Sequence, residues 1–105
     1  MAGNSNDSSG PRLVEILLEV RSHLARPGTD FVSSAWKDSA AALAEIDALI
    51  AQVRSGSILK RKLDLLFAPT ADLQEISLRS GWGDEFLGLA RAYADVVAVL
   101  NLPFR

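Results

Sequence analysis

The stretch Leu65–Ala90, LLFAPTADLQEISLRSGWGDEFLGLA, carries the most informative pattern in this 105-residue chain. Two segments whose apolar residues have helical spacing flank a Gly-Trp-Gly corner, and acidic residues stand where each segment would begin. The pattern is compatible with a DNA-reading helix-turn-helix, with the mouth of an active site, or with a capped corner in a helical bundle. The rest of the chain indicates the fold class, whereas the sequence leaves the function open.

Composition bounds the classes of protein that need consideration. A chain of 105 residues with 49% hydrophobic and 23% charged residues has the size and composition of one globular domain. The net charge of −2 provides no general attraction to nucleic acid or acidic lipid. The sequence has no cysteine, which excludes a disulfide scaffold, a thiolate metal site and a cysteine nucleophile, and fits a reducing compartment.

The first ten residues, MAGNSNDSSG, have neither a basic start nor an apolar segment and do not form a secretory signal. Their Asn, Ser and Gly content predicts a disordered tail over residues 1–10, followed by a single helical domain over residues 11–105. No apolar run approaches the roughly 18 residues that a membrane span requires. We therefore expect a soluble, cytoplasmic protein without a membrane partner.

Apolar residues recur every three or four positions in the first half of the chain, which predicts two helices there. The first begins near Pro11, buries one stripe, and ends at the breakers of residues 26–28; its stripe is Leu13, Leu17, Val20 and Leu24. The second is the longest and ends at Gly56; its stripe is Trp36, Ser39, Leu43, Ile46, Ile50 and Val53.

The second half of the sequence predicts three more helices, of which the first two are short. One covers residues 58–67, with Ser57 as its cap and Pro69 at its end, and another covers residues 73–80, between an Asp72/Glu75 capping box and Gly81. The last opens at Gly83 or Asp84 and stops at Asn101 and Pro103; its apolar face is Phe86, Leu89, Tyr93, Val97 and Leu100. No segment alternates with period two, so the predicted fold is all-α: a compact bundle of four to five helices with short connections.

Candidate catalytic groups are sparse. His23 is the only histidine, and no motif supplies the nucleophile and orienting group that a general base needs; it follows Glu19 by four residues, which predicts a surface pair near a helix C-terminus. The close carboxylates are Glu45 with Asp47, Asp72 with Glu75, and Asp84 with Glu85. The latter two pairs are explained by a helix cap and by a helix dipole.

Motifs for cofactors and metals are also missing. The sequence has no HExxH, no Asp-rich calcium loop, no His/Cys cluster and no nucleotide-binding glycine fingerprint around Gly81-Trp82-Gly83. We therefore predict no catalytic residue, no cofactor and no metal, and expect a non-enzymatic protein; an enzyme built on His23 and a carboxylate remains the least favoured hypothesis. At the corner we expect Gly81 to adopt a left-handed C-cap and Trp82 to anchor two helices.

The main alternative function is a DNA-binding regulator using residues 72–92. Five residues occupy the apolar, small and glycine positions of a helix-turn-helix: Ile76, Ser77, Gly81, Leu87 and Ala90. Against it, Asp84 and Glu85 would stand in the first turn of the recognition helix, where phosphate repels them. Nucleic acid is therefore a disfavoured partner.

A protein partner is the favoured one. The residues predicted to contact it are the corner tryptophan, four acids and two basic residues: Trp82, Asp84, Glu85, Asp72, Glu75, Lys60 and Arg61. Phe31 and Trp36 are further candidates for surface aromatics. The cluster Lys60-Arg61-Lys62 points in three directions around a helix, so it solvates the outside of that helix or forms a basic patch with Arg54. The alanine-rich second helix also leaves a homo-oligomer open.

The stretch Leu65–Ala90, together with the upstream residues 42–56, ALAEIDALIAQVRSG, resembles a group of small, uncharacterised bacterial helical proteins. The shared features are the Leu-Phe-Ala-Pro-Thr stretch, the Leu-Gln-Glu step and the Gly-Trp-Gly-Asp-Glu corner, and the similarity covers about residues 35 to 93. The group has no established activity, so the resemblance implies no catalytic residue. It implies a bacterial, cytoplasmic and non-enzymatic accessory protein, such as an immunity protein that covers a site on a toxin.

Overall fold

The computed structural model describes residues 9–31, 34, 36–56, 60–68 and 71–100. They form five α-helices: α1 (Ser9–Leu24), α2 (Ser39–Arg54), α3 (Lys60–Leu66), α4 (Asp72–Ser80) and α5 (Gly83–Leu100). No strand occurs within these residues. The predicted all-α bundle is confirmed.

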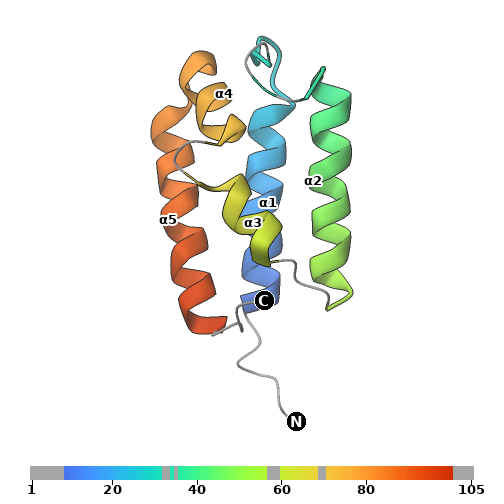
Figure 1. The fold of residues 1–105 in the computed structure, drawn as a ribbon, viewed down its shortest axis with the longest axis vertical. Helices are drawn as coiled ribbons and strands as arrows, with labels where there is room; N and C mark the ends of the chain where they lie inside the picture. Colours follow the sequence, from blue (N-terminus) through green and yellow to red (C-terminus); the bar gives the residue numbers. More distant parts are fainter. Residues whose placement is uncertain (1–8, 32–33, 35, 57–59, 69–70, 101–105) are drawn as a thin grey trace.

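The three long helices form a layer with α1 in the middle (Figure 1). Helix α1 packs against α2 on one side and against α5 on the other, and α4 packs against α5. The short helices α3 and α4 lie on one side of this layer (Figure 1). The opposite side of α1 carries exposed residues: Arg12, Glu15, Leu18, Glu19 and Ser22.

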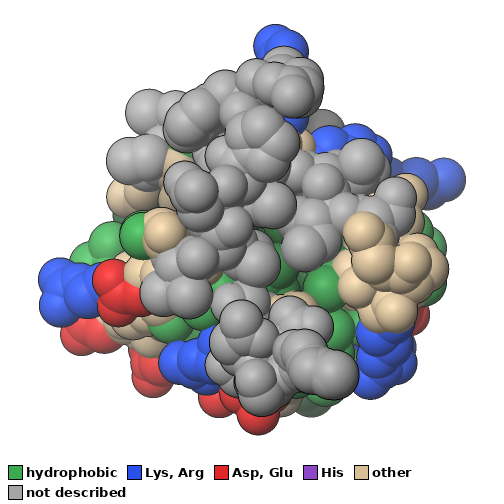
Figure 2. Space-filling view, turned by 90° about the horizontal axis from the view of Figure 1, so that it is seen from below, with side chains coloured by type: hydrophobic (Ala, Val, Ile, Leu, Met, Phe, Trp, Pro, Cys, Tyr) green, Lys and Arg blue, Asp and Glu red, His purple; other side chains and the backbone are tan. Residues whose placement is uncertain are grey.

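The core follows the predicted stripe of α1 in full and that of α2 in part, because Ser39 is exposed and Leu43 is only partly buried. All four stripe residues of α1 are buried, and α2 adds five buried residues: Ala42, Ile46, Leu49, Ile50 and Val53. Each buried aliphatic side chain of this size contributes about 1.5–3 kcal/mol relative to an exposed one. Viewed from the end where α1 begins, charged side chains lie around the rim and hydrophobic ones nearer the middle (Figure 2).

An aromatic cluster joins the chain after α3 to α5. The ring of Phe67 stacks on Tyr93 with centroids 4.7 Å apart and lies 6.3 Å from the ring of Phe86. The Tyr93 hydroxyl donates a hydrogen bond to Asp64 at 2.5 Å. Burial, together with this bond to a carboxylate, raises the pKa of Tyr93 well above its usual range. Helix α3 is therefore held to α5 by stacking and by one charge-assisted hydrogen bond.

Two helix starts differ from the sequence prediction. Helix α1 begins at Ser9, two residues before Pro11, so residues 9 and 10 belong to the helix and not to the predicted tail. Helix α2 begins at Ser39, and Trp36 lies before it rather than on its stripe. The reason is Asp38, whose side chain accepts a hydrogen bond from the Ala41 N–H at 3.0 Å and so caps the helix.

The predicted capping box at α4 is wrong. The cap residue is Ala71, whose side chain offers no acceptor, and the Ala71 carbonyl accepts from the Glu75 N–H at 3.4 Å. Asp72 and Glu75 both lie in the first turn, where the helix dipole favours negative charge. The predicted signals at Ser57, Pro69, Asn101 and Pro103 lie outside the described residues.

The predicted left-handed cap at Gly81 is confirmed. Gly81 has φ 88° and ψ 12°, and the N–H groups of Gly81 and Trp82 both point to the Ser77 carbonyl, the latter at 2.9 Å. This turn directs Trp82 inward, where its side chain is 1% exposed. Trp82 is thus the anchor between helices that the sequence predicts.

The same substitution at two glycines should have opposite effects. Gly81→Ala places a Cβ at positive φ and should lower the free energy of unfolding by about 1–2 kcal/mol. Gly88 lies inside α5, and a Cβ there meets nothing within 4 Å, so Gly88→Ala should raise stability by about 0.5–1 kcal/mol. Denaturant unfolding of both variants measures the difference, and a stabilised Gly81→Ala protein would contradict the structure.

Candidate functional site

The polar groups of the α4–α5 corner are used to hold the fold. The buried Ser77 donates its hydroxyl to the Gln74 carbonyl at 2.7 Å. The Ser80 hydroxyl accepts the Asp30 N–H at 2.9 Å and so attaches the α1–α2 loop to α4. Arg79 lies 3.6 Å from Glu75 and 3.9 Å from Asp30. None of these groups is left in a position that indicates a reaction.

The remaining carboxylate pair proposed from the sequence is also structural. The guanidinium of Arg21 binds Asp47 at 2.7 Å, joining α1 to α2, and lowers the pKa of Asp47. The Trp36 indole N–H donates to Glu45 at 3.1 Å. Glu45 and Asp47 therefore have separate partners and do not act as an acid–base pair.

The residues predicted to contact a partner are distributed over three helices. Asp84, Glu85, Glu75 and Arg61 are exposed and Asp72 is half-buried, whereas Lys60 begins α3 with its side chain outside the described residues. For Trp82 the prediction is wrong: its side chain is almost completely buried and cannot reach a partner. The Gly-Trp-Gly pattern marks a turn, and the tryptophan of that turn belongs to the core.

Leucines occupy the outside of the corner instead. Leu78 of α4 is 58% exposed and Leu87 of α5 is 55% exposed. The side chain of Leu78 lies over the start of α5, since a Cβ on Gly83 would be only 2.8 Å from its Cδ2. Leu87 is one helical turn after Gly83 on the same face. We call Leu78, Gly83 and Leu87 the corner patch.

The corner patch was not foreseen from the sequence. The helix-turn-helix alternative assigns Leu87 to an internal contact, and the exposure of Leu87 disagrees with that assignment. The spacing contained a signal: Leu87 lies about 100° from the core position Phe86 and about 160° from the core position Leu89 around the helix.

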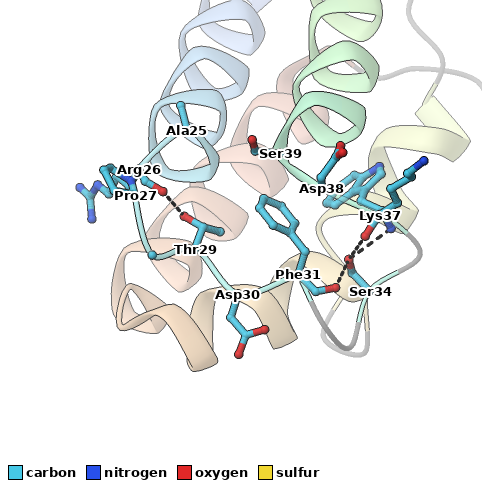
Figure 3. Close-up of a pocket in the computed structure, with 12 residues that line it drawn as sticks. Ala25, Arg26, Pro27, Thr29, Asp30, Phe31, Ser34, Lys37, Asp38 and Ser39 are labelled. Atoms are coloured by element: carbon cyan, nitrogen blue, oxygen red, sulfur yellow. Dashed lines mark hydrogen bonds between the residues drawn. The ribbon is translucent and has the colours of Figure 1, made fainter.

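One hollow lies beside the loop that joins α1 to α2 (Figure 3). Its polar groups are occupied within the loop: Thr29 donates to the Arg26 carbonyl at 2.8 Å, and Ser34 donates to the Phe31 carbonyl at 3.0 Å. Asp38, at the far side, caps α2. Phe31 points from the loop toward the helices and packs against the core. Arg26 and Lys37 also line this hollow, whose Thr29 and Ser34 hydroxyls and Asp38 carboxylate serve the loop and the helix cap.

A second hollow, of about 740 Å³, lies between α1 and α5. Its lining is Arg12, Glu15, Ile16, Leu18, Glu19 and His23 from α1, and Glu85, Gly88, Leu89 and Ala92 from α5. We call it the α1–α5 hollow. It brings together His23 and Glu85, two residues that the sequence analysis treats separately.

His23 is not the ordinary surface residue that the sequence predicts. Its ring is half-buried and stacks on Trp82, with centroids 4.7 Å apart and an angle of 12° between the planes. Nδ1 of His23 and the indole nitrogen of Trp82 are buried and have no hydrogen-bond partner within the described part of the chain. Protonating the imidazole would place a second N–H donor in this position without an acceptor.

Burial accordingly lowers the pKa of His23, and the charge of Arg26 lowers it further. Glu85 and Glu19 act in the opposite direction and offset part of the effect. In the described residues, no group of three or more His, Asp or Glu side chains is arranged to hold a metal ion. The site is therefore a neutral imidazole on an aromatic ring beside a hollow with an acidic rim.

Comparison with known proteins adds no identification. No protein-family model matches this chain, and neither a curated protein nor a solved structure shows significant similarity to it. In the part of the chain that the structure describes, no helix has the length and apolar character to cross a membrane.

The buried imidazole predicts a stability that depends on pH. Because the pKa of His23 is lower in the folded than in the unfolded protein, the unfolded chain takes up a proton first as the pH falls below about 6.5. The free energy of unfolding should therefore decrease from neutral to mildly acidic pH. His23→Phe keeps a ring against Trp82 and should remove this component, which denaturant unfolding between pH 7.5 and about 5 measures. An advantage of the wild type over His23→Phe that grows toward acidic pH would contradict the assignment.

Proposed function

We propose that this chain is a non-enzymatic protein-interaction domain, an accessory protein of the immunity type that covers a site on another protein. The observation that supports the proposal is the corner patch, where Leu78 and Leu87 are both more than half exposed. The Ser77 and Ser80 hydroxyls of the same corner are engaged in holding the fold, while its outer surface exposes these two leucines.

Exposed leucines are common when they are scattered, whereas Leu78 and Leu87 both adjoin Gly83 at one corner. Leu78 lies over Gly83, and Leu87 follows one turn later, so a partner can cover both at once. Removing such apolar surface from water provides a driving force of about 25 cal/mol for each Å². The fold gains nothing from this exposure, whereas an interface would.

The rim of the corner patch carries both signs of charge, since Arg79 pairs with Glu75 at 3.6 Å and the exposed Arg91 stands one turn after Leu87. The preference for a partner with a basic group at its rim therefore rests on Asp84. Glu75 stands one turn before Leu78 on α4, and Asp84 stands one turn before Leu87 on α5; both are exposed. Acidic groups around an apolar centre are the arrangement of a protein interface, in which rim charges guide association. They also disfavour DNA, because Asp84 and Glu85 occupy the first turn of α5.

Affinity capture from the native host tests the proposal. The double variant Leu78→Asn/Leu87→Asn removes the corner patch, and Leu65→Asn, at a leucine of α3 that is 63% exposed, is the matched control. We expect a protein that wild type and Leu65→Asn retain and that the double variant loses by about tenfold or more, as quantitative mass spectrometry measures. Circular dichroism verifies that all three proteins are folded. If no protein distinguishes the wild type from the double variant, the corner patch is not the binding surface.

A further inference from the structure

We propose that the α1–α5 hollow binds an α-helix of the partner that carries arginine or lysine side chains. This inference rests on the proposed function, because it assumes a protein partner. It adds that a helix of this partner binds to a second surface of the chain. The hollow is separate from the corner patch: Glu85, Gly88 and Ala92 line it, whereas Leu87 is about 100° from Gly88 around the helix.

The shape of the hollow suits a helix. It lies where α1 packs against α5, and its lining extends from Arg12 to His23 along α1. The eleven steps of about 1.5 Å from Arg12 to His23 give a length of about 16 Å, which is about three helical turns. A groove between two packed helices is the place where a third helix fits its side chains. No residue of α3 or α4 lines it.

The floor of the hollow allows a close approach. Ile16 and Leu89 form its buried apolar part, and the α5 side continues with Gly88 and Ala92, one turn apart. A Cβ at Gly88 would meet nothing within 4 Å, so packing inside this chain does not require glycine there. Glycine in a helix interior costs about 0.5–1 kcal/mol relative to alanine. Close approach of a partner's backbone at Gly88 would explain why glycine occupies this position, which packing within this chain does not explain.

The rim of the hollow selects the charge of the occupant. Glu15, Glu19 and Glu85 contribute three carboxylates, and Arg12 pairs with Glu15 at 3.2 Å. Neither Glu19 nor Glu85 has an ion-pair partner among the described residues, and both are exposed. A neutral His23 adds no compensating charge. Arginine and lysine fit this rim because their aliphatic stems cover apolar surface, including the half-exposed Leu18, while their charged ends reach the carboxylates.

A second copy of this chain is a less suitable occupant. Its basic cluster lies on α3, which has seven residues and is therefore about 10 Å long, shorter than the hollow. A contact between α3 of one copy and the α1–α5 hollow of another would also be heterologous and would not close into a dimer. The charge and the length of the hollow together favour a longer basic helix from a different protein.

The test uses two synthetic helical peptides of about 18 residues. One has arginines at positions i, i+4 and i+7 on a leucine-bearing face, and the other has glutamine at the same positions. His23 is the only histidine, so its imidazole resonance and the Gly88 amide report directly on the hollow in NMR titrations. We expect the arginine peptide to shift both signals, the glutamine peptide to bind at least about fivefold more weakly, and added salt to weaken the arginine peptide.

Charge-neutral variants locate the binding surface. Glu19→Gln/Glu85→Gln should weaken the arginine peptide about five- to tenfold, and Gly88→Leu should abolish its binding by filling the floor. The matched control Glu75→Gln/Asp84→Asn also removes two exposed carboxylates, one of them in the same first turn of α5, and should change the affinity less than about twofold. Retained thermal unfolding transitions confirm that each variant is folded.

Three results would overturn the inference. The first is equal binding of the arginine and glutamine peptides, and the second is equal affinity in the Glu19→Gln/Glu85→Gln protein and its control. The third is self-association of the wild type in light scattering that Gly88→Leu removes, because the occupant would then be a second copy. If the peptide titration gives one of these results, the capture experiment at the corner patch still tests the proposed function. If the capture experiment finds no partner, the proposed function is overturned, but the peptide titration still measures what the α1–α5 hollow binds.

Discussion

The left-handed turn at Gly81 is the constraint on which the α4–α5 half of the molecule depends. It ends α4 by satisfying the Ser77 carbonyl and turns the chain so that the next residue, Trp82, enters the core. Once buried, Trp82 offers its face to His23 of α1, which fixes the relative positions of three helices around one ring. A non-glycine residue would adopt this backbone conformation only at a cost comparable to a large part of a small domain's stability margin.

The same turn separates an inner and an outer surface. Inside it, the indole of Trp82 and the imidazole of His23 stack in a position where neither nitrogen named above finds a hydrogen-bond partner among the described residues. Outside it, Leu78 covers the glycine that begins α5. The α4–α5 corner thus concentrates its polar atoms in holding the backbone and exposes apolar side chains, the reverse of what a reactive site needs.

Sequence periodicity was sufficient for the helices because their buried faces repeat every three or four residues. The stripe of α1 is correct in full, and the turn glycine of α4 is correct in its backbone conformation. Helix starts were less accurate, because a single cap residue decides each of them: Asp38 excludes Trp36 from α2, and Ala71 takes the cap position expected for Asp72.

The candidate site was largely not predictable from the sequence. His23 and Trp82 are 59 positions apart, and spacing along the chain says nothing about which distant helices meet. The exposure of Leu78, Leu87 and Gly88 likewise depends on which helices pack against them in the folded protein, and the sequence spacing does not determine that packing.

The hydrogen bond from the Asp30 N–H to Ser80 joins segments that are 50 residues apart. The α1–α2 and α4–α5 pairs, by contrast, are neighbours in the chain, joined through residues 25–38 and 81–82, so neither pair requires the closure of as long a segment. The bond at Ser80 adds one polar contact to the joint between these two pairs, which is otherwise made by the packing of α1 against α5 and by the stack of His23 on Trp82. Hydrogen exchange of the Asp30 amide would therefore report on the attachment of the α1–α2 loop to α4 rather than on the α1–α5 interface.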